Sequence, residues 1–196
     1  MSRITPEEHR EPLKDDFNQS HAFLIGINSY KDLPPLKTAV NDVEKLAEVL
    51  EKKQSFTVFP PLYDATKEDI EKLLNETLPQ TIKSKKDRVV FYFAGHGVAA
   101  DSDEKPEGFI IPADARPFDD SSFIPMQTLH AAIKKLPCKH LLVVLDCCFS
   151  GAFSWSSRYR DITTRLPKRI FKERFDRFVK DNAWQVITSS AYDQRA

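Results

Sequence analysis

The stretch RVVFYFAGHG, residues 88–97, decides how this chain folds. Its first part, RVVFYF, is a short apolar run of β-branched and aromatic residues, which is typical of a strand buried on both faces of a parallel sheet. The run leads into His96, and the glycines on either side of this histidine let backbone and substrate approach closely. Because ligands gather at the carboxyl ends of parallel strands, the stretch predicts both an α/β fold and a functional residue.

A second stretch, HLLVVLDCCFSG at residues 140–151, follows the same pattern. The apolar run HLLVVL predicts another buried strand, and Asp146, Cys147 and Cys148 come directly after it. If the two strands are parallel neighbours, their ends lie at one edge of the sheet. We therefore expect His96 and Cys148 to come together although they are distant in sequence.

Strands and helices alternate in the rest of the chain. The apolar pattern predicts further strands over 22–27, 56–62 and 184–188, and helices over 38–53, from a cap at Thr66 and over 126–136. Alternation at this spacing predicts an α/β domain of three layers, in which helices cover both faces of a largely parallel central sheet.

Composition restricts the classes of function. Among 196 residues, 29 lysines and arginines balance 29 aspartates and glutamates, so no overall field attracts nucleic acid or a membrane surface. The apolar runs are too short to span a bilayer, and the polar amino terminus has no apolar core of a secretory signal. Three cysteines cannot form a disulfide framework, so we expect reduced thiols and a cytoplasmic location.

Composition also divides the chain into parts. Residues 1–20 are charged and lack apolar periodicity, which indicates a flexible amino-terminal arm before a domain over 21–196. Residues 152–183 form a basic linker or insertion in this domain, with nine lysines and arginines against three acidic residues between Arg158 and Lys180. This segment could be a solvated face over a buried stripe, a regulated linker, or a patch for an acidic partner or nucleic acid.

A cysteine beside a histidine has an obvious chemistry. The thiolate is the nucleophile, and an imidazole can take the proton from the thiol near neutral pH. The backbone N–H groups of Gly97 and Cys148 could hold a developing oxyanion. The alternative is structural, because buried cysteines are common and most histidines catalyse nothing. Finding both residues at predicted strand ends favours catalysis.

The motifs resemble those of a known family. FYFAGHG and VVLDCCFSG resemble the histidine and cysteine boxes of the caspase-like peptidases, particularly the metacaspases and bacterial caspase homologues. HAFLIGINSY, AVNDVEKLAEVL, EGFIIPADA and WQVITSSAYDQRA resemble other parts of that domain, so the resemblance covers about residues 20–196. It implies a three-layer caspase-like sandwich and a cysteine endopeptidase. The family domain continues through a further strand and helix, so we expect a large-subunit portion whose partner segment is missing.

The resemblance also implies roles for single residues. It makes Cys148 the nucleophile and His96 the general acid and base, with Cys147 at a position that a small residue usually holds. Asp42 and Asp146 match acidic walls of the primary specificity pocket, and Asp193 is a weaker candidate for the same pocket. Carboxylates there would select Lys or Arg before the scissile bond.

Several points stay open at this level. Ala94 replaces a serine often found in the metacaspase pocket, and Asp42 could instead pair with Lys45 or solvent on the helix face.

The catalytic pair of Cys148 and His96 needs no metal, so we expect no cofactor, with calcium activation as an open alternative. Proteins or peptides with Lys or Arg are the expected partners, and the chain could cut its own basic linker. The rival interpretation is a catalytically silent module that binds partners.

A zinc site is a weaker alternative still. Its ligands would be Cys138, His140 and the adjacent cysteines, but their spacing does not suit a tetrahedral ion. Asp114 is expected to order its loop by hydrogen bonding rather than to take part in catalysis.

Overall fold

The central sheet is parallel throughout the part of the chain that the computed structural model describes, residues 17–100, 107–147 and 183–188. Its strands are β1 (Ser20–Gly26), β2 (Thr57–Val58), β3 (Leu62–Tyr63), β4 (Arg88–Ala94), β8 (His140–Asp146) and β9 (Ala183–Thr188). They lie in the order β2-β1-β4-β8-β9, and β3 also pairs with β1. The two quoted stretches are therefore neighbours at the centre of the sheet, as their sequence predicts.

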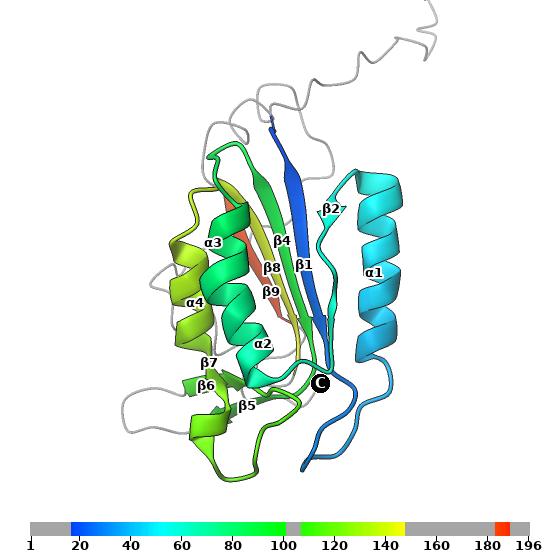
Figure 1. Cartoon of the computed structure of the whole chain (residues 1–196), viewed down its shortest axis with the longest axis vertical. Coiled ribbons are helices and arrows are strands. Elements are labelled where there is room, and N and C mark those ends of the chain that lie inside the picture. Colours follow the sequence, from blue (N-terminus) through cyan, green and yellow to red (C-terminus); the bar gives the residue numbers. More distant parts are fainter. Residues whose placement is uncertain (1–16, 101–106, 148–182, 189–196) are drawn as a thin grey trace, which may run out of the picture.

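Helices cover both faces of this sheet, and the predicted three-layer α/β fold is confirmed (Figure 1). The helical segments are α1 (Ala39–Gln54), α2 (Lys67–Lys72), the π-helical turn η1 (Leu73–Thr77), α3 (Leu78–Thr81), the 3-10 turn η2 (Asp120–Ser122) and α4 (Met126–Lys134). Helix α1 packs on one face, whereas α2, α3 and α4 pack on the other.

The side chains of β4 alternate between these two layers. Phe91 and Phe93 are fully buried in the larger core with α2, α3 and α4, whereas Tyr92 and Ala94 face α1. The larger core therefore holds the biggest apolar side chains, and the α1 face carries the polar group of Tyr92.

The strand predicted over 56–62 is in fact two short strands. Phe59, Pro60 and Pro61 separate β2 from β3, although both strands pair with β1. A proline ring has no N–H to give to a ladder, so two consecutive prolines interrupt the pairing. The β-branched and aromatic composition of the stretch hides this break.

The helix that begins after Thr66 has the expected start. The Thr66 side chain accepts from the backbone N–H of Asp69, and the Asp69 carboxylate accepts from the N–H of Thr66, which completes a capping box. The sequence gives no obvious sign of the π-helical turn η1 that follows. Pro79 explains it, because a proline cannot donate to the carbonyl four residues back and its ring crowds that carbonyl.

A second, antiparallel sheet was not expected from the sequence. It consists of β5 (Gly97–Ala100), β6 (Glu107–Ile110) and β7 (Ile124–Pro125). Figure 1 shows it at the carboxyl end of the central strands, and β5 follows β4 after only two residues. The chain that leaves the histidine box is therefore held in a small sheet of its own.

Some predictions fall outside the described residues. These are the amino-terminal arm up to residue 16, the basic segment over 152–182, and the site candidates Cys148 and Asp193. Within the described part of the chain, none of the helices has the length and apolar character that crossing a membrane requires.

Candidate active site

The histidine and cysteine boxes lie side by side at the carboxyl edge of the sheet. Strands β4 and β8 pair in register up to Ala94 and Asp146. Just beyond them, the N–H of Gly95 donates to the carbonyl of Asp146 over 3.2 Å. His96 follows Gly95 after β4, and Cys147 follows Asp146 after β8, with Cys148 next in the sequence. The topology therefore brings the ends of β4 and β8 to one edge of the sheet, whereas Cys148 itself lies outside the described residues.

The side chain of His96 is half-buried and its orientation is fixed by a backbone carbonyl. Its Nε2 atom lies 2.9 Å from the carbonyl oxygen of Pro34. A carbonyl can only accept, so we assign the proton to Nε2, which leaves Nδ1 of the neutral ring as the base. Sequence analysis missed Pro34, because a backbone carbonyl leaves no signal in the residue type.

A polar cluster lies on the α1 face of the same edge. The Tyr92 hydroxyl donates to Oδ2 of Asp146 at 3.5 Å, a long hydrogen bond. Burial raises the pKa of Tyr92 to about 12, and the charges of Asp146 and Asp42 add to the effect. The Asp146 carboxylate therefore contacts this phenol, and the charge of Asp42 acts on it as well. Tyr92 was not singled out from the sequence, where it looks like any aromatic strand residue.

The two acidic residues reach the cluster from different elements. Asp42 is half-buried in the first turn of α1, and Asp146 is an exposed residue at the end of β8. No ion pair joins Asp42 to Lys45 in the described part of the chain. Ala94 is buried on the same face, so the position often held by serine adds no hydroxyl.

Comparison with known proteins decides the family. The family model of the caspase domain, a peptidase family, matches residues 19–194. The chain belongs to the caspase family. Because some relatives lack activity, membership supports a caspase-like peptidase or a relative of one.

A solved structure of similar fold supports the architecture of this caspase domain. It is the crystal structure of protein GSU0716 from Geobacter sulfurreducens, with a TM-score of 0.52 and 17% sequence identity. The match covers 68% of this chain and 51% of that chain, so the caspase domain spans about half of its neighbour. At this identity the likeness concerns the fold alone. No protein of curated function matches the chain.

The remaining candidates occupy different environments in the caspase domain. Gly97 is half-buried and begins β5, where it pairs with Ile110. Cys147 is only 3% exposed, so its thiol is out of reach of a bulky substrate. Burial raises the pKa of Cys138 to about 11, which keeps this thiol protonated and unreactive near neutral pH. Across the described ranges, no group of three or more His, Cys, Asp or Glu side chains could hold a metal ion.

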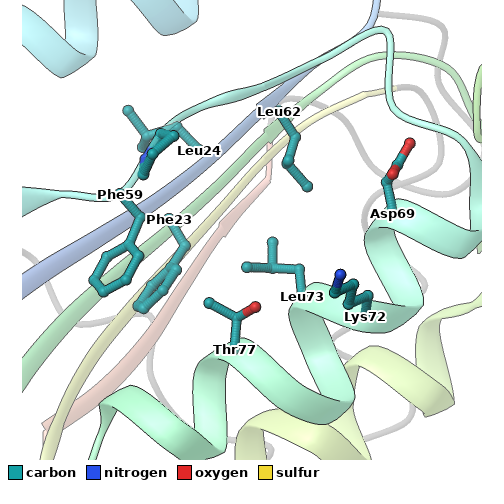
Figure 2. A pocket seen from close by; sticks show the side chains of 9 residues that line it. Phe23, Leu24, Phe59, Leu62, Asp69, Lys72, Leu73 and Thr77 are labelled. Carbon is teal, nitrogen blue, oxygen red and sulfur yellow. The ribbon is translucent and has the colours of Figure 1, made fainter.

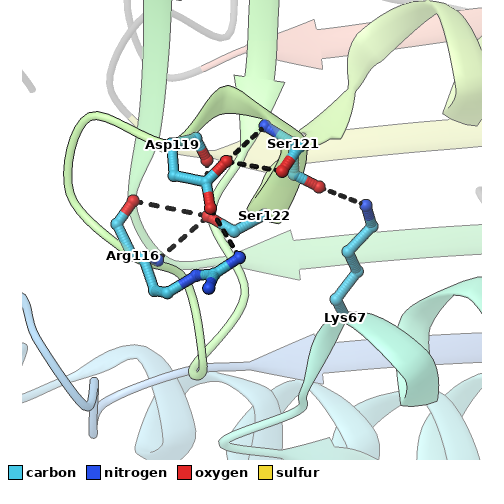
Figure 3. Close-up of polar contacts among 5 residues, drawn as sticks. All are labelled: Lys67, Arg116, Asp119, Ser121 and Ser122. Carbon is cyan, nitrogen blue, oxygen red and sulfur yellow. Dashed lines mark hydrogen bonds and ion pairs between the residues drawn. The ribbon is translucent and has the colours of Figure 1, made fainter.

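A polar loop beside the edge is held by its own side chains (Figure 3). Asp114 accepts from the N–H of Lys67 at the start of α2, and Lys67 Nζ donates to the carbonyl of Ser121. Asp119 binds Arg116 and Ser121 in the same loop. Asp114 therefore ties this loop to the start of α2 through a distant segment, rather than through the local hydrogen bonding that the sequence led us to expect.

One crevice among the described residues is lined by none of His96, Asp146 and Tyr92. It has a volume of about 310 Å³ and lies on the face opposite α1 (Figure 2). Its lining residues are Phe23, Leu24, Phe59, Pro60, Leu62, Asp69, Lys72, Leu73 and Thr77. This set contains no cysteine and no imidazole, so it does not compete with His96 as a site of nucleophilic catalysis.

Proposed function

We propose that this caspase domain is a cysteine endopeptidase in which Cys148 is the nucleophile and His96 the general acid and base. The main observation behind this proposal is the hydrogen bond between Nε2 of His96 and the carbonyl of Pro34. It leaves Nδ1 as the base at the edge where β8 leads into Cys148. A base with a fixed tautomer beside a thiol is the arrangement that thiol catalysis needs.

The proposed reaction has two stages. Nδ1 of His96 takes the proton of the Cys148 thiol, and the thiolate attacks the peptide carbonyl. The N–H groups of Gly97 and Cys148 stabilise the oxyanion, and His96 then gives its proton to the leaving amine. The acyl group is left as a thioester on Cys148. Water, activated by His96, hydrolyses this thioester and restores the thiol, so the proposal needs no metal or cofactor.

The acidic cluster supports selection of a basic residue before the scissile bond. Asp42 and Asp146 both act on Tyr92, so a guanidinium or ammonium group bound there would meet two negative charges. Asp193 belongs to the proposed pocket through the family resemblance. The substrates proposed are therefore proteins or peptides with Arg or Lys at this position.

Self-processing follows from this specificity. The segment over 152–183 is rich in Arg and Lys, so an active enzyme would find its preferred residue there. Mass spectrometry of an active preparation should reveal cuts after basic residues in this segment, and these cuts should be missing in Cys148→Ala. Basic peptides cleaved by an enzyme that leaves this segment intact would remove the self-processing proposal.

Hydrolysis of fluorogenic peptides ending in Arg, Lys or Asp tests the central proposal. Cys148→Ala should lose at least about 10⁴-fold in kcat/KM, because the nucleophile is gone. Cys147→Ala should keep the activity within a fewfold, because the Cys147 thiol is buried. Cleavage should follow Arg and Lys and not Asp.

The opposite result is equally clear. The wild-type chain could be folded and yet cleave none of these peptides, with or without calcium. If its Cys148 also fails to react with a basic acyloxymethyl ketone, the peptidase proposal is refuted. The interpretation would then be a caspase-family module that binds partners without cutting them. Loss of activity on Cys147→Ala with retention on Cys148→Ala would overturn the assignment of the nucleophile.

A further inference from the structure

Tyr30 lies in the loop that follows β1 and leads to α1. Its aromatic ring packs against both the large core and the small cluster around Phe109. The backbone near it is held firmly, because Lys31 donates to the carbonyl of Ala113 over 2.8 Å. The N–H groups of Asn28 and Ser29 both donate to Oδ1 of Asp64. Tyr30 therefore stands on a loop with little freedom to move.

The hydroxyl of Tyr30 reaches the backbone of His96. It accepts a hydrogen bond from the His96 N–H over 2.7 Å, and the two rings are 4.6 Å apart between centroids, with a tilt of 42°. His96 is the second residue beyond β4, past the point where the ladder to the neighbouring strands ends. The Tyr30 hydroxyl therefore supplies the acceptor that a strand would otherwise give.

The other groups of His96 are also bound. Its carbonyl accepts from the N–H of Ile111 over 3.1 Å, and its ring Nε2 is held by Pro34. Tyr30 thus completes a set of three contacts that fixes the backbone on both sides and the ring at one end. Two of the contacts, Tyr30 and Pro34, come from the loop between β1 and α1, and the third comes from Ile111 just after β6.

The glycine before His96 makes room for this contact. A Cβ atom on Gly95 would lie 2.8 Å from the Tyr30 hydroxyl and 2.8 Å from the ring of Phe93. Both neighbours are buried or held in place, so neither could move aside cheaply. The first glycine of the AGHG motif is therefore explained by the approach of Tyr30, in addition to any need for space around a substrate.

The hydroxyl of Tyr30 stays protonated, which suits its role as the hydrogen-bond acceptor of the His96 N–H. Burial raises the pKa of Tyr30 well above its ordinary value, and the hydrogen bond from His96 opposes this only in part. The charges of Cys147 and Asp64 raise the pKa further. The hydroxyl is therefore neutral at every pH at which a peptidase works, and it lies near the residue that precedes Cys148.

We propose that Tyr30 is a positioning residue for His96, and that its hydroxyl holds the histidine backbone so that the imidazole faces the cysteine box. The catalytic part of this proposal rests on the proposed peptidase function. The structural part does not, because the contact exists whether or not the chain cuts peptides. The two parts can therefore be tested separately.

Tyr30→Phe tests the positioning role because it removes the acceptor and keeps the ring. In ¹⁵N-labelled full-length protein, the His96 amide should exchange its hydrogen at least about tenfold faster, while amides at the centres of β1 and β4 keep their rates. The ¹⁵N signals of the His96 ring should move away from a single Nε2–H tautomer. In peptide hydrolysis, kcat should fall about tenfold with KM unchanged.

Tyr63→Phe is the matched control. Tyr63 belongs to β3 and is 44% exposed, and it should change neither the His96 signals nor kcat. If Tyr30→Phe leaves the His96 amide exchange and ring signals as in the wild type, the positioning role is refuted. If those signals change while kcat stays within twofold, the catalytic part is refuted. A wild type without peptidase activity would count against the proposed function, and the His96 spectra would still decide the role of Tyr30.

Discussion

The two ends of the central strands use the same residue types for different purposes. At the amino-terminal end, His21 and Asp87 are buried, at 5% and 3% exposure. At the carboxyl end, His96 is half-buried and Asp146 is exposed. The residue type therefore decides less than the edge at which it stands, because loops leave the sheet and open space for ligands at the carboxyl end.

The partners of these residues explain the contrast. Neither ring nitrogen of His21 has a hydrogen-bond partner among the described residues, and the ring packs near Phe59. Asp87 uses one oxygen to accept from the N–H groups of Lys83 and Ser84. His96 instead has one nitrogen bound to a carbonyl and one left for chemistry. The fold encloses His21 and Asp87 at the amino-terminal end, whereas the carboxyl end has a ring nitrogen of His96 left to react.

Replacing the histidine at each end of the strands should give the largest difference in activity between two variants. His96→Ala should lower kcat/KM by about 10³-fold, because a general base contributes on that order. His21→Gln should leave kcat/KM within twofold, since the two residues stand at opposite ends of the strands. Hydrolysis of an arginyl fluorogenic peptide measures both. Equal losses in the two variants would mean that the amino-terminal end also takes part in catalysis.

A pair of aspartate variants should sharpen the comparison at a smaller scale. Asp146→Ala should lower cleavage after Arg by about 10- to 100-fold, because one charge-assisted hydrogen bond contributes about 1.5–3 kcal/mol. Asp87→Ala should leave cleavage unchanged but lower the free energy of unfolding by about 1–3 kcal/mol, since two part-buried N–H groups lose their acceptor. Urea denaturation and peptide hydrolysis separate these effects. The comparison breaks down if Asp87→Ala alters selectivity or Asp146→Ala only destabilises.

The pH dependence of stability should give the smallest effect. Burial lowers the pKa of His21 below its ordinary 6.5, although the charge of Asp87 opposes the shift. The unfolded chain then binds a proton more readily than the folded one, so stability is full above about pH 6.5 and falls as the pH drops below it. His21→Gln should flatten this decline between pH 7 and 5 in thermal unfolding. Some slope should remain, because the pKa of His130 is lowered as well.

Much of the fold could be predicted because its signals are local. The runs at 88–93 and 140–145 became adjacent central strands, and the cap at Thr66 formed as expected. The break at Pro60 and the small antiparallel sheet were missed. The break at Pro60 arises because proline lacks a backbone N–H donor within a run that otherwise looks like one strand. The small sheet depends on pairing between segments whose own hydrophobic patterns are weak.

The sequence by itself determined the α/β architecture, the family, and the candidate pair His96 and Cys148, because periodicity and motifs are properties of consecutive residues. Only the tertiary structure decided which groups surround His96 and Asp146. The carbonyl of Pro34 and the hydroxyls of Tyr30 and Tyr92 come from distant segments or from the backbone. Their roles depend on how the strands and loops meet in space, and no local pattern in the chain records a contact of that kind.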